Sequence, residues 1–307
     1  MATRQAKGTS SVIKKVEAEK APVEKKESTE VAKVENTALA NVPEFMDASD
    51  FGGGFEGADA ESFAIPFLQI LQKMSPMVDE DDGAYVEGAK AGMLINTVTK
   101  KLYDGKAGLI VIPCAYKRTF ILWGGREGDG GFQGEFTVEQ FEALKSDPAQ
   151  VMTIEGRSYK PEQDGSVNEK KSSYYADTRS HFLITIDPDT NETGRVILSL
   201  AATQTKASKM LMTALQQKKI EVQGVKRTPP TFANLVKLTT VGMSNDKGSW
   251  SGAQFALDGL VTDAELYKEA KSFHNDIVAG NVQVDHNKSG HVETGNATDT
   301  PKEAEGF

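Results

Sequence analysis

The sequence predicts an α+β fold built on an antiparallel β-barrel, with added helices and a disordered tail at each end. Three observations predict this class. Runs of β-branched and aromatic residues alternate with turn signals, helical periodicity is confined to a few short segments, and both ends of the chain are polar. The chain has 307 residues, of which 38% are hydrophobic and 26% are charged. This hydrophobic fraction is low for a globular protein, so we expect part of the chain to be unfolded or heavily solvated.

The two ends of the chain have the composition of disordered segments. Residues 1–42 consist mainly of Lys, Glu, Ala, Val, Ser and Thr, and residues 281–307 are polar and acidic with no aromatic residue before Phe307. Such segments bury too little apolar surface to offset the entropy of ordering the chain. We therefore expect one folded domain over residues 43–280, between two flexible tails.

The first elements of this domain are predicted to be a short helix and a series of strands. Pro66 suits the first turn of a helix, and Phe67, Ile70, Leu71 and Met74 follow at the spacing of one helical face. Apolar runs rich in β-branched residues then predict strands, with a turn at 104–105, over residues 93–98, 108–116 and 118–123.

The middle of the domain begins with a glycine-rich stretch, residues 124–134, which predicts a loop. Thr137 and Gln140 then form a capping-box pattern that predicts a helix ending near Pro148. Strands are expected at 151–154, 180–187 and 194–200.

The last part of the domain is predicted as helix, two strands and a second helix. Apolar residues at helical spacing predict the first helix over 204–219, and the strands are expected at 232–241 and 250–257. The final helix opens with a capping box at Thr262 and Glu265 and closes at Gly280. From Arg179 onward the order is strand, strand, helix, strand and strand, preceded by the strand region 108–123, and this is the order of an OB-like barrel. Another α+β topology stays open, because the insertion at 124–175 is long.

The sequence gives little support to catalysis or metal binding. The four histidines show no metal-site spacing, and the nucleophile-elbow and phosphate-loop motifs are absent. The single cysteine, Cys114, excludes an internal disulfide and a zinc ribbon, and its apolar neighbours indicate a packed side chain rather than a reactive thiol. The acidic run 79–82 lacks the ligand alternation of a calcium loop. We expect no enzyme activity, no metal and no cofactor.

The strongest functional signal is the segregation of charge in a chain whose formal net charge is −9. Between Arg195 and Trp250 there are nine basic residues and two acidic ones, whereas residues 44–90 contain eleven acidic residues and two lysines. A local excess of positive charge on an acidic protein is typical of an anion-binding surface.

Aromatic residues are interleaved with these basic residues, and cationic tracks with stackable rings are typical of proteins that bind single-stranded nucleic acid. In strands, however, aromatic side chains usually belong to the core. We predict that the nucleic-acid-binding residues are Lys117, Arg118, Trp123, Arg126, Arg179, Lys206, Lys209, Lys237, Lys247 and Trp250.

Residues 92–116, with the run Gly-Met-Leu-Ile-Asn-Thr-Val at their start, resemble proteins encoded by tailed bacteriophages, many of them uncharacterised. The similarity extends through residues 247–250. The last residues, 303–307, resemble the tails of single-stranded DNA-binding proteins, in which acidic residues precede a terminal phenylalanine. This second resemblance implies that Phe307 recruits a partner, such as a phage replication or recombination protein.

Together these features predict a non-enzymatic single-stranded DNA-binding protein of phage replication or recombination, without strong sequence preference. The alternative is a phage virion or assembly protein, in which segregated charge serves subunit contacts. No run approaches the roughly 20 apolar residues of a membrane span, and the start lacks a secretory signal, so we expect the protein in the host-cell cytoplasm. Oligomeric state and DNA-versus-RNA preference stay open.

Overall fold

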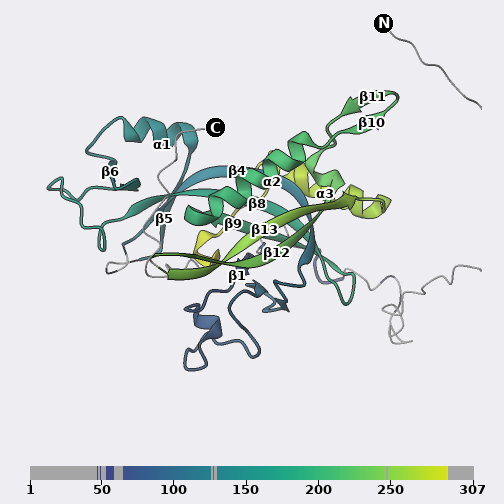
Figure 1. The fold of residues 1–307 in the computed structure, drawn as a ribbon, viewed down its shortest axis with the longest axis horizontal. Coiled ribbons are helices and arrows are strands. Elements are labelled where there is room, and N and C mark those ends of the chain that lie inside the picture. Colours follow the sequence, from purple (N-terminus) through teal and green to yellow (C-terminus); the bar gives the residue numbers. More distant parts are fainter. Residues whose placement is uncertain are drawn as a thin grey trace, which may run out of the picture. The chain divides into compact units, whose positions relative to one another are not determined.

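Two long strands, β4 (Leu109–Trp123) and β8 (Tyr174–Ile186), form the antiparallel ribbon on which the rest of the fold is built (Figure 1). They pair from Ile110 opposite Ile186 to Trp123 opposite Tyr174, with one register shift beside Cys114. This computed structural model describes residues 47, 49, 53–58, 65–125, 127, 130–246 and 248–289. All elements named below belong to one compact unit, Ser49–Phe307.

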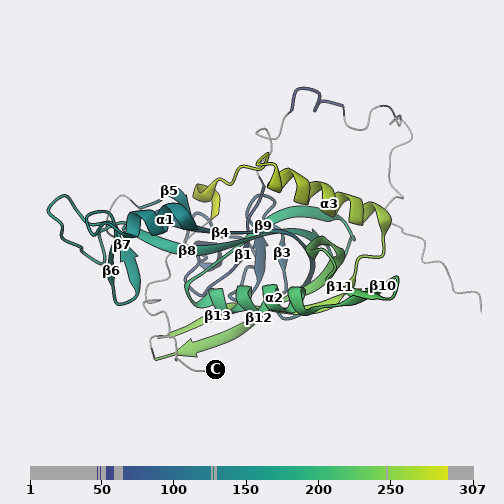
Figure 2. The same cartoon turned by 90° about the horizontal axis from the view of Figure 1, so that it is seen from above.

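The proximal half of the ribbon belongs to a five-stranded part of the main sheet, which has eight strands in the described residues. The order of these five strands is β13 (Gly248–Leu260), β12 (Asn234–Asn245), β4, β8 and β9 (Thr193–Ala201). Helix α2 (Thr205–Gln217) lies on one face and helix α3 (Ala264–Val278) on the opposite face (Figure 2). Leu211 and Leu215 of α2 pack on an aliphatic cluster, whereas Phe273 of α3 packs on Phe182. The sheet is therefore buried on both faces.

The distal half of the ribbon carries different neighbours. Strand β5 (Phe132–Thr137) pairs with β4, and β7 (Arg157–Tyr159) joins β6 (Met152–Ile154) to β8. Helix α1 (Val138–Lys145) covers one face through Phe141, whose ring stacks on Phe120 with a centroid distance of 3.7 Å. The Thr137–Gln140 capping box is confirmed, with both reciprocal hydrogen bonds formed. The distal core is mainly aromatic.

A small N-terminal sheet replaces the helix that we predicted after Pro66. It consists of β1 (Leu68–Ile70), β2 (Leu94–Asn96) and β3 (Leu102–Tyr103). The 3₁₀-helix η3 (Pro76–Val78) lies between β1 and β2 in the chain. The prediction was wrong because Phe67 and Leu68 are buried in clusters on opposite sides of the main sheet. Successive side chains that point to opposite faces require an extended chain. Phe67 forms a single parallel bridge with Ile197 of β9.

The α+β class is confirmed, but the predicted closed barrel is not found. In the described residues, β9 and β13 at the two edges of the five-stranded sheet share no strand ladder. Two glutamine side chains bind β13 instead, one from the segment after β1 and one from the segment after β9. Gln72 donates to Ser251 O and accepts from Ser251 N, and Gln204 donates to Ser251 O and accepts from Ala253 N. The sheet is curved and open.

Several boundaries differ from those predicted. Helix α3 begins after Asp263, whose side chain accepts from Leu266 N, rather than at Thr262; its end is followed by Gly280 at a positive φ, as expected. The short elements β10 (Ile220–Val222), β11 (Val225–Arg227), η4 (Ala202–Gln204), η5 (Thr231–Ala233) and η6 (His286–Ser289) were not predicted.

The folded unit also extends into the segment that we expected to be the start of the C-terminal tail. Val282 and Val284 pack against the α3 side of the sheet, and His286 is buried. The predicted tail at 1–42 and residues 290–307 lie outside the described residues. Among the described helices, none is long and apolar enough to cross a membrane.

Candidate nucleic-acid interface

The segment from α2 to β11 forms a ridge of basic side chains. Ser208, Leu211 and Leu215 turn toward the sheet, because apolar and small residues recur at helical spacing, and the lysines point away. The hairpin β10–β11 continues from the helix and projects beyond it (Figure 1). Within 205–227 the only acidic residue is Glu221. We define the basic ridge as Lys206, Lys209, Lys218, Lys219, Lys226 and Arg227.

The positive charges of the basic ridge are not neutralised by carboxylates of the described residues. None of the six side chains forms an ion pair with another described residue. Lys218 is half-buried and donates to Gly259 O at 2.7 Å, and Lys219 donates to Thr228 and to Gln216 O, so uncharged oxygens hold these two. The other four are exposed.

A buried histidine ties the start of this ridge to the ribbon. His181 Nε2 lies 2.8 Å from Ser208 Oγ of α2, and its ring contacts that of Tyr116 on the neighbouring strand. Burial, helped by the nearby charge of Arg179, lowers the pKa of His181 to about 4. The imidazole is therefore neutral at physiological pH and acts as an anchor for α2.

Two arginines lie on the same face of the sheet, next to His181 along the ribbon. Arg118 binds Asp177 through two hydrogen bonds of 2.9 Å, and Arg179, opposite Arg118 in register, approaches Asp177 at 3.4 Å. One carboxylate thus offsets two guanidinium groups that would otherwise repel each other. Arg179 is 6% exposed, and its Nη1 has no hydrogen-bond partner among the described residues.

Lys117 and Trp123 lie on the other face, because neighbouring residues of a strand alternate. The Lys117 ammonium lies over the ring of Phe182, 5.5 Å from its centroid, and lines a cavity of about 280 Å³ with Glu135 and Ser180. His286 lies 3.4 Å from the Glu135 carboxylate and lowers its pKa. Trp123 lines a second cavity, described below.

Lys237 and Trp250 occupy a third place, on the hairpin β12–β13. Lys237 is exposed, and Trp250 is half-buried opposite Met243. The indole Nε1 of Trp250 is buried without a hydrogen-bond partner among the described residues. Arg126, Lys247 and Phe307 lie outside the described residues, so their predicted roles stay predictions.

The structure therefore divides the predicted interface. It brings Arg118, Arg179, Lys206 and Lys209 to one face, whereas Lys117 and Trp123 face the opposite side and Lys237 and Trp250 lie on the edge hairpin. The candidate set omitted the ridge residues of β10–β11, although the sequence signal of charge segregation contained them. Their place beside α2 was the missing information.

The described residues hold no group of three His, Cys, Asp or Glu side chains that suits a metal ion. Cys114 is buried, and desolvation raises the pKa of its thiol to about 12. A thiol with this pKa is protonated at physiological pH and a poor nucleophile. The packed state of Cys114 agrees with its apolar sequence neighbours.

Comparison with known proteins identifies a phage family. A family model described as Pam3 phage gp34-like protein matches residues 33–283, a range that includes the ribbon, α2, α3 and the basic ridge. No curated protein and no solved structure matches the chain. The expected similarity to phage proteins is thus supported over the folded unit, whereas Phe307 lies beyond the matched range.

Proposed function

We propose that this chain, which belongs to the Pam3 phage gp34-like family, is a non-enzymatic protein that binds single-stranded DNA in phage replication or recombination. The basic ridge carries the proposal. Six cations that have no carboxylate partner in the described part of the chain lie along one continuous helix and hairpin, in a chain whose formal net charge is −9. Such a local excess attracts a polyanion through counterion release, whatever its base sequence.

The neighbouring arginines extend this surface toward the distal half of the ribbon. Arg118 is exposed on the α2 face, and one carboxylate, that of Asp177, is shared between the guanidinium groups of Arg118 and Arg179, so the three side chains keep a net charge of +1. The guanidinium group of arginine matches the geometry of phosphate oxygens. A single-stranded DNA that lies along α2 therefore meets cations from the β10–β11 hairpin to the β4–β8 ribbon.

The order of the long elements supports the same proposal. Strands β4, β8 and β9 precede α2, strands β12 and β13 follow it, and the sheet order is β13-β12-β4-β8-β9. An OB-fold has a five-stranded, partly open barrel and binds oligonucleotides on its second and third strands and adjoining loops. We propose that these five strands form an OB-like barrel that is open between its third strand, β9, and its fifth strand, β13.

Fluorescence anisotropy with labelled single-stranded and double-stranded oligonucleotides, at two salt concentrations, tests this function on the full chain. The double variants Lys206→Ala/Lys209→Ala and Lys226→Ala/Arg227→Ala should weaken binding of all single-stranded sequences alike. Each lost phosphate contact should lower the salt slope by about 0.7. Lys271→Ala, an exposed lysine on α3, is the matched control and should change nothing. Absent or salt-insensitive binding of the unmodified chain would refute the proposal.

A second candidate function is a virion or assembly protein. It is favoured by exposed apolar residues on the two hairpins, namely Val222 and Val225 on β10–β11 and Val241 and Met243 on β12. Exposed apolar side chains at strand edges favour protein contacts. Self-assembly measured by light scattering, combined with no affinity for single strands, would support this alternative over the first proposal.

Recruitment of a partner through Phe307 is a separate part of the proposal. Phe307→Ala should leave oligonucleotide affinity unchanged and abolish capture of phage replication or recombination proteins from infected cells. Unchanged capture would remove Phe307 from this role. Measuring both quantities on the same variant separates recruitment from nucleic-acid binding.

A further inference from the structure

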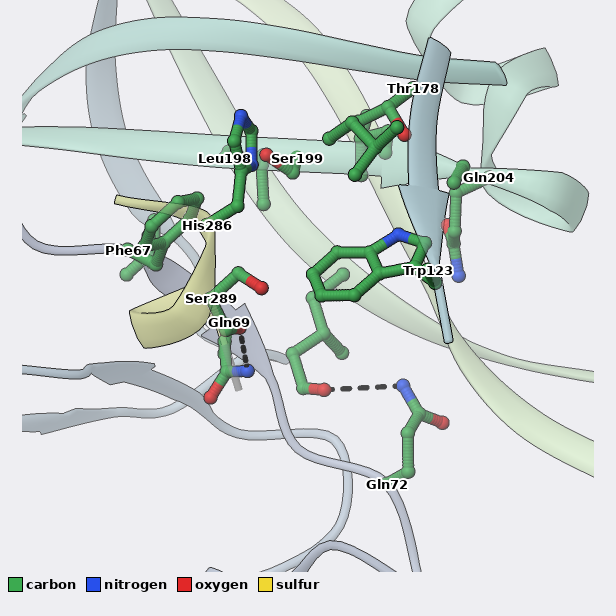
Figure 3. Close-up of a pocket in the computed structure, with 15 residues that line it drawn as sticks. Phe67, Gln69, Gln72, Trp123, Thr178, Leu198, Ser199, Gln204, His286 and Ser289 are labelled. Carbon is green, nitrogen blue, oxygen red and sulfur yellow. Dashed lines mark hydrogen bonds between the residues drawn. The ribbon is translucent and has the colours of Figure 1, made fainter. Parts of the chain in front are cut away.

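A half-open cavity of about 180 Å³ lies where β1 separates from β9 (Figure 3). Ile197 of β9 donates to Pro66 O, and Phe67 bridges Ile197, but β1 then pairs with β2 instead of continuing along β9. The edge of β9 from Leu198 to Ala201 therefore faces a cavity instead of a neighbouring strand. The end of β4 and the segment η6 form the other walls.

Aromatic rings form one side of this cavity. Trp123 is 7% exposed and meets Phe132 edge-on, with ring centroids 6.2 Å apart. Phe132 in turn stacks on His286 at 5.1 Å. Figure 3 shows the indole of Trp123 across the cavity from Ser289. These contacts hold the indole in place, so a flat ligand finds a preformed surface.

Two glutamines of the cavity lining are held in place by hydrogen bonds. Gln72 and Gln204 each use both ends of the amide in hydrogen bonds to β13, at Ser251 and Ala253. Gln69 donates to Ser289 O and so ties η6 to β1. The cavity is therefore bounded by fixed groups, as expected of a binding site rather than of a gap between loose segments.

Two buried polar atoms at this cavity lack hydrogen bonds. His286 is 2% exposed, and its Nδ1 has no partner among the described residues; the same is true of Ser289 Oγ. On its other side, His286 Nε2 lies 3.4 Å from a Glu135 carboxylate oxygen. Buried polar atoms are nearly always satisfied, so these two point to a ligand with its own donor and acceptor.

The lining restricts the chemistry of that ligand. Among the described residues that line the cavity, His286 is the only titratable one, so they offer no fixed cation to a phosphate or carboxylate. A cavity of roughly 150 Å³ binds benzene, so this one has room for a single six-membered ring. A neutral, flat ring with hydrogen-bonding groups on its edge is a pyrimidine base.

We propose that this cavity receives one pyrimidine base of a bound single strand, with its ring against Trp123 and its edge toward His286 Nδ1 and Ser289 Oγ. The inference rests on the proposed function. Trp123 lies on the face opposite the basic ridge, so the bound strand passes the edge of β9 to reach the cavity. The ridge holds phosphates without regard to sequence, whereas the cavity adds a preference for pyrimidines. Base stacking on an aromatic side chain is the mode by which single-strand binders hold bases.

Tryptophan fluorescence tests the proposal, because the chain has two tryptophans and Trp250→Phe leaves Trp123 as the only one. Oligothymidine should quench this emission, and an abasic oligonucleotide of equal length should bind the ridge without quenching it. Ser289→Ala should lower affinity for oligothymidine roughly fivefold and leave abasic affinity unchanged. Ser272→Ala on the exposed surface of α3 is the matched control.

The possible results separate this inference from the proposed function. Oligothymidine binding without quenching of Trp123, or stronger quenching by oligodeoxyadenosine, overturns the pyrimidine site and leaves the function intact. Quenching by free thymidine without any oligonucleotide binding keeps the site and refutes the function. Because the Trp250→Phe titration leaves every cavity residue in place, a folding defect of Ser289→Ala does not remove the test.

Discussion

The proximal and distal halves of the β4–β8 ribbon are buried by different means. The proximal half has a helix on each face: the α2 face packs aliphatic side chains such as Leu183 and Val236, whereas the α3 face mixes aliphatic residues with the rings of Phe182 and Phe273. The distal half has α1 on one face and a core of aromatic rings, among them Phe120 and Phe141. The same two strands thus serve two cores of different composition.

Polar residues are concentrated where one core gives way to the other. Residues 117–119 of β4 pair with residues 178–180 of β8, and these six positions carry Lys117, Arg118 and Arg179. The arginine pair and the cavity beside Lys117 both lie at this polar band. The comparison teaches that candidate binding groups collect on the ribbon between its two hydrophobic cores.

The largest expected effects are the losses of stability caused by removing a buried ring from either the proximal or the distal core. Phe182→Ala removes a fully buried ring from the proximal half and should lower the free energy of unfolding by about 3–5 kcal/mol in urea denaturation. Phe141→Ala should instead open mainly the distal half, so hydrogen exchange should rise in α1 and β5 while β12 stays protected. Equal loss of protection in β12 would show that the halves unfold as one unit.

The second prediction concerns pH at His181, beside the polar band. Its folded pKa of about 4 is below the ordinary value of 6.5, so the unfolded chain binds the proton first. This contribution to stability is complete above about pH 6.5 and is lost as the pH falls toward 4. Between pH 7 and pH 5 the loss should be roughly 2 kcal/mol. His181→Gln should show a correspondingly smaller decrease; identical pH profiles would contradict the assignment.

A smaller effect is expected at the edge of the proximal sheet. Gln72→Ala removes the two hydrogen bonds to Ser251 and should lower the free energy of unfolding by about 1–2 kcal/mol. Gln254→Ala, an exposed glutamine on the same strand as Ser251, should change it by less than about 0.5 kcal/mol. Equal values for both variants would show that the Gln72 tie does not stabilise the sheet.

The smallest expected effect is the reactivity of the Cys114 thiol, which lies inside the proximal half. Its thiol is buried and has a pKa raised to about 12, so the native protein should not react with a thiol reagent at mildly alkaline pH. Denaturation should expose one reactive thiol. Modification of the native protein at the rate of the denatured chain would show that the proximal core opens readily.

Local signals predicted the elements that local interactions determine. The Thr137 capping box, helix α2 and the hairpin β12–β13 follow from side chains close together in the sequence. Residues 66–74 were mispredicted because apolar residues at i, i+3 and i+4 also fit a strand buried on two faces. The strand rather than the helix forms here because β1 pairs with β2, about 26 residues further along the chain.

The excess of positive charge in the basic ridge could be read from the sequence, because charge adds along a continuous segment, but the place of β10–β11 beside α2 could not. Strand pairing placed Lys117 and Arg118, neighbours in sequence, on opposite faces of the sheet. Only the tertiary structure brought Gln69 beside Ser289, 220 residues away, to form the cavity of Trp123. The physical reason is that strand register sets which face each side chain occupies, and distant pairings set that register.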